Sequence, residues 1–304
     1  MKIHVSSETS RLREVILGLP DSMGPVPTLR ETFDAKSYES VRRHIYPKEE
    51  DVKAEMDAFE AVLLKYGVKV CRPEPVPDCN QVFARDVGFV IDDKIIVSNI
   101  IPNRQNEIDA YGKIYSRIHY KQIYNLPEAV HVEGGDVVLW NDIIFLGQYA
   151  FDDYPKVKTA RTNRLALDYL RMLFPDKEII PLNLRKSDTN PREGVLHLDC
   201  TFMPVGHDKA IIYKPGFLNP RDADRLVAMF GPRNVFELTR DEMYAMNSNV
   251  FSISEDVVVI EENFKRLGDR LRNAWGMTVE TVPYYEISKM GGLLRCSTLP
   301  LRRD

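Results

Sequence analysis

The sequence predicts an α/β fold made of five repeated units arranged as a ring. Polar residues recur at nearly even intervals of 50, 63, 50 and 47 residues, and each stands beside an apolar segment. Periods of this size are typical of repeated supersecondary units. Polar groups at matching places in such units could converge on one centre. The recurring residues are Asp86, Asp136, Asp199, Asn249 and Cys296.

Each of the first four recurring residues stands at the start of an apolar hairpin. Tight turns at residues 91–93 and 140–142 indicate antiparallel pairing, which disfavours a parallel doubly wound sheet. The hairpins are expected at 87–98, 137–147, 200–214 and 250–261. A helix and then a short strand are expected after each hairpin, with the strands at 122–124, 177–181, 234–238 and 278–282.

The helices in these units follow from apolar residues at helical spacing. The third helix has the clearest boundaries, because Asn219 is a good N-cap, Pro220 suits the first helical position and Gly231 suits the end. The four helices are expected around residues 108–118, 165–172, 220–230 and 264–275.

The N-terminal segment fits a fifth unit that lacks one strand. Residues 14–18 and 68–71 have strand character, and the apolar spacing from Val52 to Leu63 marks a helix between them. The missing strand is expected from residues 293–299, near the other end of the chain. The ring would then close by joining the two termini, which removes exposed sheet edges. Because no linker interrupts the pattern, we expect a single catalytic domain over residues 1–304.

The composition is ordinary for a globular protein, with 44% hydrophobic and 28% charged residues. A net charge of -4 does not favour broad nucleic-acid binding, and no apolar run approaches the ~18 residues of a membrane span. The N-terminus lacks the apolar core of a signal peptide. Four cysteines do not make a disulfide framework in a chain of this size. We therefore expect a cytoplasmic protein with reduced thiols, and a homo-oligomer is compatible with these features.

Cys296 is the candidate nucleophile. It follows the pair Gly291 and Gly292, and it needs a nearby cation or imidazole to gain thiolate character. Arg295 is adjacent, but on a strand it would point to the opposite face. The alternative is a small buried apolar residue, which is the usual fate of a lone cysteine.

His197 and Asp199 are separated by one residue. On a strand, residues i and i+2 share a face, so both side chains would point into the ring centre while Cys200 would face away. The alternative is a satisfied core histidine beside a surface acid. Glu133 and Asp136 flank a glycine pair, which allows close backbone approach, positive φ or a simple turn.

The combined set of one thiol, one imidazole and several carboxylates indicates chemistry on a cationic substrate. A carboxylate matches a guanidinium in bidentate fashion, a thiolate can attack the guanidinium carbon, and a histidine can pass a proton to a leaving amine. A metal site built from His197, Asp199, Glu133 and Asp136 is the competing interpretation, but no zinc-type Cys-x-x-Cys or His-Glu-x-x-His spacing is present. The missing Cys-Gly-x-Cys context disfavours a papain-like protease.

Four motifs resemble those of the guanidino-group-modifying enzymes, the pentein superfamily. This family includes arginine deiminases, dimethylarginine dimethylaminohydrolases and amidinotransferases, and the match runs in the family's order over most of the chain. The resemblance implies a five-bladed α/β propeller with pseudo-fivefold symmetry, closed by the N- and C-terminal segments. The motifs are Asn80–Asp86 (NQVFARD), Glu133–Asp136 (EGGD), His197–Asp199 (HLD, followed by CTFMPV) and Gly291–Pro300 (GGLLRCSTLP).

The resemblance also implies roles for the matched residues. Cys296 would attack the guanidinium carbon and form a covalent thiouronium intermediate, and His197 would be the general acid and base. Glu133 would bind the guanidino group and assist His197, while Asp86 and Asp199 would clamp the guanidinium nitrogens. No metal or organic cofactor is implied. Further substrate-binding positions are expected at Arg161, Asp136, Asn247 and Asn249, and Arg161 resembles an arginine that binds the substrate carboxylate in deiminases.

The C-terminal motif favours one branch of the family. Arg-Cys-Ser-Thr-Leu-Pro-Leu resembles the ending of deiminases more than the Cys-Trp-Thr ending of glycine amidinotransferases. We therefore expect a hydrolase of arginine or a close derivative. The alternatives are an amidinotransferase, a dihydrolase that leaves ornithine, and a binding protein with the same fold and no catalysis. Three segments that break the repeat are candidate lids, at residues 20–37, 148–159 and 186–193.

Overall fold

The sheets of the protein share one strand pattern. The computed structural model covers residues 1–304 and contains five three-stranded sheets, none of which closes on itself. The predicted unit of hairpin, helix and strand is confirmed. In each sheet the middle strand pairs antiparallel with one neighbour and parallel with the other. The strands, sheet by sheet, are β1 (Leu12–Leu17), β2 (Lys69–Cys71) and β15 (Thr298–Arg303); β3 (Gly88–Ile91), β4 (Lys94–Val97) and β5 (Ile123–Asn125); β6 (Val137–Trp140), β7 (Ile143–Gln148) and β8 (Glu178–Asn183); β9 (Phe202–Val205), β10 (Lys209–Ile212) and β11 (Val235–Glu237); β12 (Phe251–Ser252), β13 (Val257–Glu261) and β14 (Thr278–Val282).

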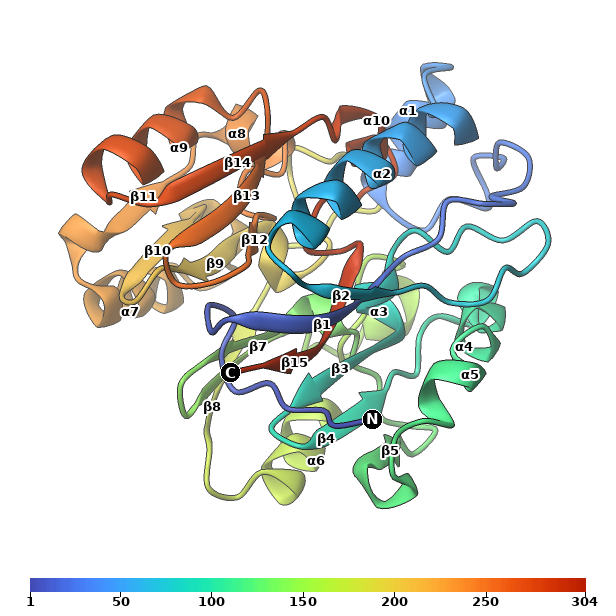
Figure 1. Ribbon diagram of the computed structural model, residues 1–304, viewed down its shortest axis with the longest axis horizontal. Helices are drawn as coiled ribbons and strands as arrows, with labels where there is room; N and C mark the ends of the chain where they lie inside the picture. The colour runs from blue at the N-terminus through green and yellow to red at the C-terminus, as the bar shows by residue number, and fades with distance from the viewer.

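The first sheet joins the two ends of the chain. Figure 1 shows β15, in dark red, beside β1, in dark blue, and the two strands pair antiparallel. The pairing of the termini is confirmed, but the expected bounds of the closing strand were wrong. Backbone N–H groups of Ser297 and Thr298 bond to the carbonyls of Leu293 and Arg295, and these bonds fold residues 293–297 into turns ahead of the strand. Cys296 therefore lies in a turn, not on a strand.

The helices run between the hairpins and the parallel strands. The helix α7 has the predicted caps, because the Asn219 side chain accepts a bond from the Arg221 N–H and Gly231 ends the helix at φ +82°. The helix expected around 108–118 is instead two short helices, and the one expected around 264–275 continues from α9 into a π-helical turn over Arg270–Ala274. The helices are α1 (Ala35–Arg42), α2 (Glu49–Lys65), α3 (Ala84–Val87), α4 (Asn106–Asp109), α5 (Gly112–Tyr115), α6 (Leu165–Leu173), α7 (Pro220–Phe230), α8 (Arg240–Tyr244), α9 (Lys265–Asp269) and α10 (Tyr285–Ser288).

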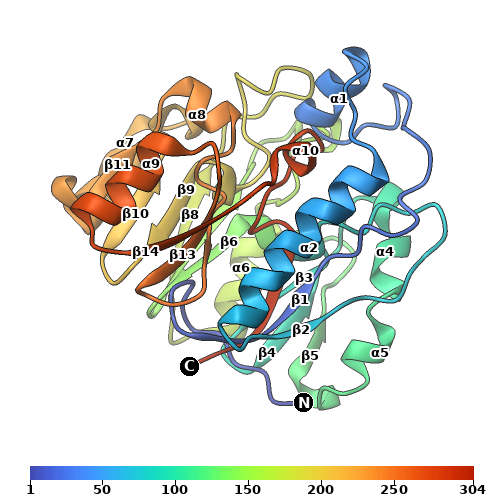
Figure 2. The ribbon, with the colours of Figure 1, turned by 45° about the horizontal axis from the view of Figure 1, so that its top comes forward.

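The long helix α2 connects the terminal sheet to the fourth repeat. In Figures 1 and 2 it crosses above β1 and β2, and it contacts β2, β14 and α10. Its buried face carries Phe59, whose ring packs edge-on against Phe251 and Tyr284. Aromatic pairs in this geometry contribute roughly 0.5–1.5 kcal/mol beyond their buried area. The helix therefore packs on both the terminal sheet and the fourth repeat. No helix has the length and apolar character that crossing a bilayer requires.

The buried apolar side chains form two clusters that meet around the recurring polar residues. Ala84 and Val87, which flank Asp86, belong to the smaller cluster. Cys200 and Cys296 belong to the larger one. The polar groups are therefore surrounded by packed side chains, where unpaired charge is costly and each polar atom needs a partner.

Candidate active site

Three of the recurring acids sit in short turns that immediately precede a strand. Asp86 lies in α3 before β3, Asp136 in a 3-10 turn (Gly134–Asp136) before β6, and Asp199 in a 3-10 turn (Leu198–Cys200) before β9. The expectation that His197 and Asp199 share a strand face was therefore wrong. The turn separates the two side chains, because His197 faces a cavity while Asp199 points to Arg295.

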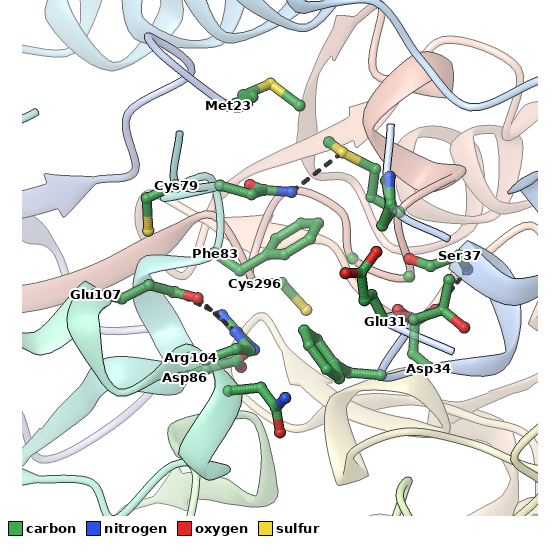
Figure 3. A pocket seen from close by; sticks show the side chains of 18 of the residues that line it. Met23, Glu31, Asp34, Ser37, Cys79, Phe83, Asp86, Arg104, Glu107 and Cys296 are labelled. Carbon is green, nitrogen blue, oxygen red and sulfur yellow. Dashed lines mark hydrogen bonds and ion pairs between the residues drawn. The ribbon is translucent and has the colours of Figure 1, made fainter. Parts of the chain in front are cut away.

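A cavity of about 420 Å³ contains the candidate nucleophile. Of the predicted site residues, it is lined by Cys296, His197, Asp86 and Arg161. Figure 3 shows Cys296 and Phe83 in the middle, with Asp86, Arg104 and Glu107 on one side and Glu31, Asp34 and Ser37 on the other. Glu133, Asp136, Asp199, Asn247 and Asn249 do not line the cavity.

His197 is held between two carboxylates. Its Nε2 lies 2.8 Å from Glu133 Oε2, and its Nδ1 lies 3.8 Å from Asp86 Oδ1. Both His197 Nδ1 and Asp86 Oδ1 are buried and have no hydrogen-bond partner. Because buried polar groups are rarely left unpaired, the free oxygen of Asp86 marks a place for a ligand that donates hydrogen bonds.

Asn249 holds Cys296 at two points. The side-chain oxygen of Asn249 accepts a bond of 3.2 Å from the Cys296 N–H, and its amide nitrogen donates to the Cys296 sulfur at 3.1 Å. A donor to the sulfur favours the thiolate over the thiol. Asn249 thus acts on the nucleophile without contacting the cavity itself.

The charges around the site shift three pKa values. Burial opposes the imidazolium of His197, but the carboxylates of Asp86, Asp136 and Glu133 outweigh it and raise the pKa of His197 to about 9. Burial also opposes the charged form of Glu133, but the Arg161 guanidinium and the His197 ring lower the pKa of Glu133 to about 2. Contact with the Cys200 thiol, burial, and the Asp199 carboxylate raise the pKa of Cys296 well above its ordinary value. The histidine is therefore charged at neutral pH, and the free cysteine is a thiol.

Asp199 belongs to a buried ion-pair network. Its Oδ2 accepts a bond of 2.7 Å from Arg295 Nη1, and Arg295 also bonds Glu8 through Nη2 at 2.7 Å. Arg295 was expected to point to the face opposite Cys296, but Arg295 Nη1 and the Cys296 sulfur both approach Asp199 Oδ2, so this expectation was wrong. Cys200 was expected to face away from the site, but its sulfur lies 3.6 Å from Asp199 Oδ1, while Cys296 lies 3.8 Å from Oδ2.

Asp136 and the glycines before it support the His197 segment. Asp136 Oδ1 accepts the N–H of Leu198 at 2.9 Å, and its Oδ2 accepts the hydroxyl of Thr162 at 2.7 Å. A Cβ atom on Gly135 would lie 2.6 Å from the His197 ring, and one on Gly134 would lie 2.3 Å from a backbone oxygen. The glycine pair therefore allows the His197 ring and a neighbouring backbone oxygen to approach closely, and neither glycine has a positive φ. Asp136 positions the segment that carries His197.

Two arginines line the cavity, and each forms an ion pair with a buried carboxylate. Arg161 Nη1 lies 3.1 and 3.0 Å from the two oxygens of Glu133, and its Nη2 donates to the Phe33 carbonyl at 2.7 Å. Arg104 pairs with Asp86 and Glu107. The sequence reasoning missed Arg104 and Glu107; their i,i+3 spacing on a helical segment was the available signal, but it is equally common on solvated helices.

One of the three candidate lids lines the cavity. Residues 20–37 contribute nine of the lining residues, which are Met23, Pro25, Val26, Pro27, Glu31, Thr32, Phe33, Asp34 and Ser37. Residues 148–159 and 186–193 contribute none, and they bond to each other through Asp188 and Thr159.

A metal could in principle meet ligand atoms of Asp86, Glu133 and His197, which lie within 4.8 Å of one another. Neither Asp136 nor Asp199 belongs to this group. Glu133 already carries the Arg161 guanidinium on both oxygens, and a divalent cation there would be repelled by that charge. The donor set therefore fits a cationic organic ligand better than a metal.

The repeated three-stranded sheets and the thiol, imidazole and carboxylate set define a pentein, the class of guanidino-group-modifying enzymes, as the sequence resemblance implied. The chain matches the family model of N,N dimethylarginine dimethylhydrolase, eukaryotic, over residues 32–303. It belongs to that family.

Two bacterial proteins illustrate the similarity in sequence. It is 30% identical to the uncharacterized protein YkgA of Bacillus subtilis over 98% of this chain and 94% of that protein. It is 22% identical to the arginine deiminase of Treponema denticola, over 80% of this chain and 65% of that protein. YkgA therefore matches over nearly its whole length, and the deiminase is the longer protein.

Solved structures share the fold. SxtG, an amidinotransferase from Microseira wollei, superposes with a TM-score of 0.76 at 19% identity, covering 99% of this chain and 97% of that one. The N-terminal domain of ArgZ, an arginine dihydrolase from cyanobacteria, gives a TM-score of 0.77 at 18% identity, covering 95% and 97%. At these identities the likeness shows the fold alone.

Proposed function

We propose that the protein is a cysteine-dependent hydrolase that acts on the guanidino group of arginine or an arginine derivative. The observation that carries the proposal is the pair of unpartnered buried atoms, Asp86 Oδ1 and His197 Nδ1, in the cavity that contains Cys296. A guanidinium presents several N–H donors in one plane, so it can donate to Asp86 while its carbon faces the sulfur.

Binding of the substrate activates the nucleophile. The positive guanidinium placed against Cys296 offsets the nearby carboxylates, so the pKa of the thiol falls and its proton leaves to solvent. The thiolate then attacks the guanidinium carbon. His197, which is an imidazolium at neutral pH, donates the proton at Nδ1 to the departing nitrogen, while Glu133 holds Nε2. An amine leaves and a covalent thiouronium remains on Cys296.

Water completes the reaction. His197, now neutral, takes a proton from a water molecule, and the resulting hydroxide attacks the thiouronium carbon. The carbon–sulfur bond breaks while the new hydroxyl group releases its proton to solvent, the neutral ureido product leaves, and Cys296 returns as the thiolate. Residues 20–37 support this step by lining the cavity and limiting the access of other nucleophiles.

An amidinotransferase is the second candidate, because the solved structures with the same fold include SxtG and the inosamine-phosphate amidinotransferase StrB1 from Streptomyces griseus, the latter with a TM-score of 0.78. In that case an amine replaces water at the thiouronium. We further propose that the five sheets form a closed, single-domain ring in the cytoplasm, as the sequence predicts.

Product analysis tests the proposal. The protein is incubated with arginine, methylated arginines and agmatine, with and without glycine as the acceptor. A ureido product and a released amine without glycine support the hydrolase. Ornithine formed only with glycine replaces it with the transferase, and ornithine with ammonia replaces it with a dihydrolase. A folded protein that turns over no guanidine contradicts the proposal. A non-catalytic binding protein with the same fold would then be the remaining candidate.

A further inference from the structure

We propose that a second cavity, separate from the one that contains Cys296, binds a small organic anion that also carries an ammonium group, as an acidic amino acid does. The volume of this second cavity is about 420 Å³, equal to that of the Cys296 cavity, and the two share no lining residue. Its lining comes from α1, α8, α9 and α10 and the segments beside them. Binding there does not depend on the chemistry proposed for Cys296.

Two segments of the chain form a wall between the two cavities. In α1, Ser37 lines the Cys296 cavity, whereas Lys36 and Ser40 line the second cavity. Residues 290–292 line the Cys296 cavity, whereas Lys289 lines the second. The Ser40 hydroxyl donates to the Lys289 carbonyl at 2.7 Å, and this bond joins the two segments. A ligand in the second cavity would therefore contact the back of the wall that faces Cys296.

The second cavity carries more positive than negative charge. Five cationic and three acidic side chains line it. Arg266 is compensated by Glu242, but Lys36 and Lys265 form no ion pair. The Lys36 ammonium lies 3.7 Å from the centre of the Tyr244 ring, and burial lowers the pKa of Lys36 to about 8. A carboxylate beside this half-buried ammonium would gain a charged partner without displacing an existing ion pair.

Two hydrogen-bond acceptors in the same cavity have no cationic partner. The side chain of Asn247 is only 4% exposed, and its Oδ1 is buried and has no hydrogen-bond partner. The Glu261 carboxylate is also buried, and it accepts bonds only from the N–H and Nδ2 of Asn263, at 2.9 and 2.8 Å. Because buried acceptors are rarely left unpaired, Asn247 and Glu261 fit an N–H donor on the ligand. The cavity thus offers partners for a carboxylate and for an ammonium, the two groups of an amino acid, and the excess of cations favours an acidic one.

Calorimetric titration of the full chain tests the site with three ligands. L-Glutamate carries both kinds of group, glutarate lacks the ammonium, and cadaverine lacks the carboxylates. We expect L-glutamate to bind, glutarate to bind roughly fivefold more weakly because a hydrogen bond is lost, and cadaverine not to bind. This order in the wild type tests the inference without any variant.

Two substitutions locate the bound ligand. Lys36→Met should weaken the binding of L-glutamate by about tenfold or more, because it removes a charge-assisted bond. Asn247→Leu breaks no hydrogen bond of Oδ1 in the free protein, and it should weaken the binding of L-glutamate but not of glutarate, which has no ammonium. Lys156→Met is the matched control, because Lys156 is an exposed lysine outside both cavities. Circular dichroism shows whether each variant is folded.

Three results would overturn the inference. The first is that the wild type binds no L-glutamate at millimolar concentrations, and the second is that folded Lys36→Met and Asn247→Leu bind it as tightly as the wild type. The third comes from alkylation of Cys296 by iodoacetamide in saturating L-glutamate. Continued alkylation would place the ligand outside the Cys296 cavity, as expected, whereas full protection would place it inside that cavity. None of these measurements requires turnover, so failure of the proposed hydrolase would be seen separately.

Discussion

Asp199 Oδ2 accepts a hydrogen bond of 2.7 Å from Nη1 of Arg295, the residue that precedes Cys296 in the chain. Asp199 and Arg295 are both almost completely buried. A carboxylate bonded in this way positions the turn that carries the nucleophile, and it has little freedom to bind a substrate. Asp86, which lines the cavity and keeps one oxygen unpartnered, is the acid that remains open to a guanidinium.

The first prediction contrasts these two acids. Asp199→Ala removes one of the two carboxylates that balance the buried charge of Arg295. We expect this substitution to lower the free energy of unfolding by about 3 kcal/mol. Asp86→Ala should cost less, because Arg104 keeps its bidentate pair with Glu107, but it should raise KM strongly. Urea denaturation and steady-state kinetics measure both effects. If Asp199→Ala left stability unchanged and altered only KM, Asp199 would be a direct clamp, as the family resemblance implies.

The second prediction concerns the two groups assigned to the chemistry. Cys296→Ser and His197→Gln should each abolish turnover. Cys296→Ser should leave the melting temperature near that of the wild type, whereas His197→Gln should lower it, because Glu133 and Asp86 lose the buried imidazolium between them. Cys71→Ser is the matched control, because Cys71 lies in β2 and does not line the cavity. A large drop in melting temperature for Cys296→Ser would instead mean that the cysteine is a packing residue.

The third prediction isolates Asn249, which donates to the Cys296 sulfur at 3.1 Å. Asn249→Ala removes that donor, and the pKa of the thiol should rise by about one unit or more. The rate of inactivation by iodoacetamide, followed against pH, reports the thiolate directly. The profile should move to higher pH relative to the wild type. An unshifted profile would show that the amide only holds the backbone N–H of Cys296.

Local signals explain which parts of the fold were predictable. The sequence Asn219–Pro220 with Gly231 contains the caps of α7, and those contacts lie within one helical segment. The repeat spacing likewise located the hairpins, because pairing across a tight turn is local. The closing strand was displaced because its start depends on the turn bonds around Leu293, which no apolar pattern reveals.

The sequence predicted which kinds of residue form the site, but it did not predict how their side chains are arranged. Of the five evenly spaced residues, Asp86 and Cys296 line one cavity, and His197 lies beside them, whereas Asp136, Asp199 and Asn249 do not line it. Arg295, the partner of Asp199, lies 96 residues away, and strand periodicity placed it on the face opposite Cys296. Such ion pairs depend on how two repeats pack against each other. The alternation of side chains along a single strand contains no information about that packing.

The fourth prediction is a pH dependence of stability. The pKa of His197 is raised from 6.5 to about 9 in the folded protein by the carboxylates that outweigh its burial. Below pH 6.5 the imidazole is protonated in both states, and its contribution to stability is complete. The contribution is lost as the pH rises through 9, because the folded state must then release the proton. Glu133 stays charged throughout this range, since its pKa is lowered to about 2.

Urea denaturation of the wild type and His197→Gln between pH 6 and 9.5 measures this contribution. The wild type should lose more unfolding free energy over the interval than the variant, which lacks the titrating group. Equal losses would mean that the ring has the same proton affinity in the folded and unfolded states, and the placement of Asp86 and Glu133 around it would be incorrect.

The fifth prediction tests the position of the His197 ring without changing a polar group. A Cβ atom on Gly135 would lie 2.6 Å from Cγ and Nδ1 of His197, well inside van der Waals contact, so Gly135→Ala must displace the ring. A misplacement of about 1 Å can reduce turnover by roughly a hundredfold, and we expect kcat to fall by that order with the protein still folded. Gly112→Ala is the control, because its Cβ would meet nothing within 4 Å. If kcat in Gly135→Ala matched that of the control, the ring would not need its observed place beside the glycine, and the assignment of Nδ1 as the proton donor would fail.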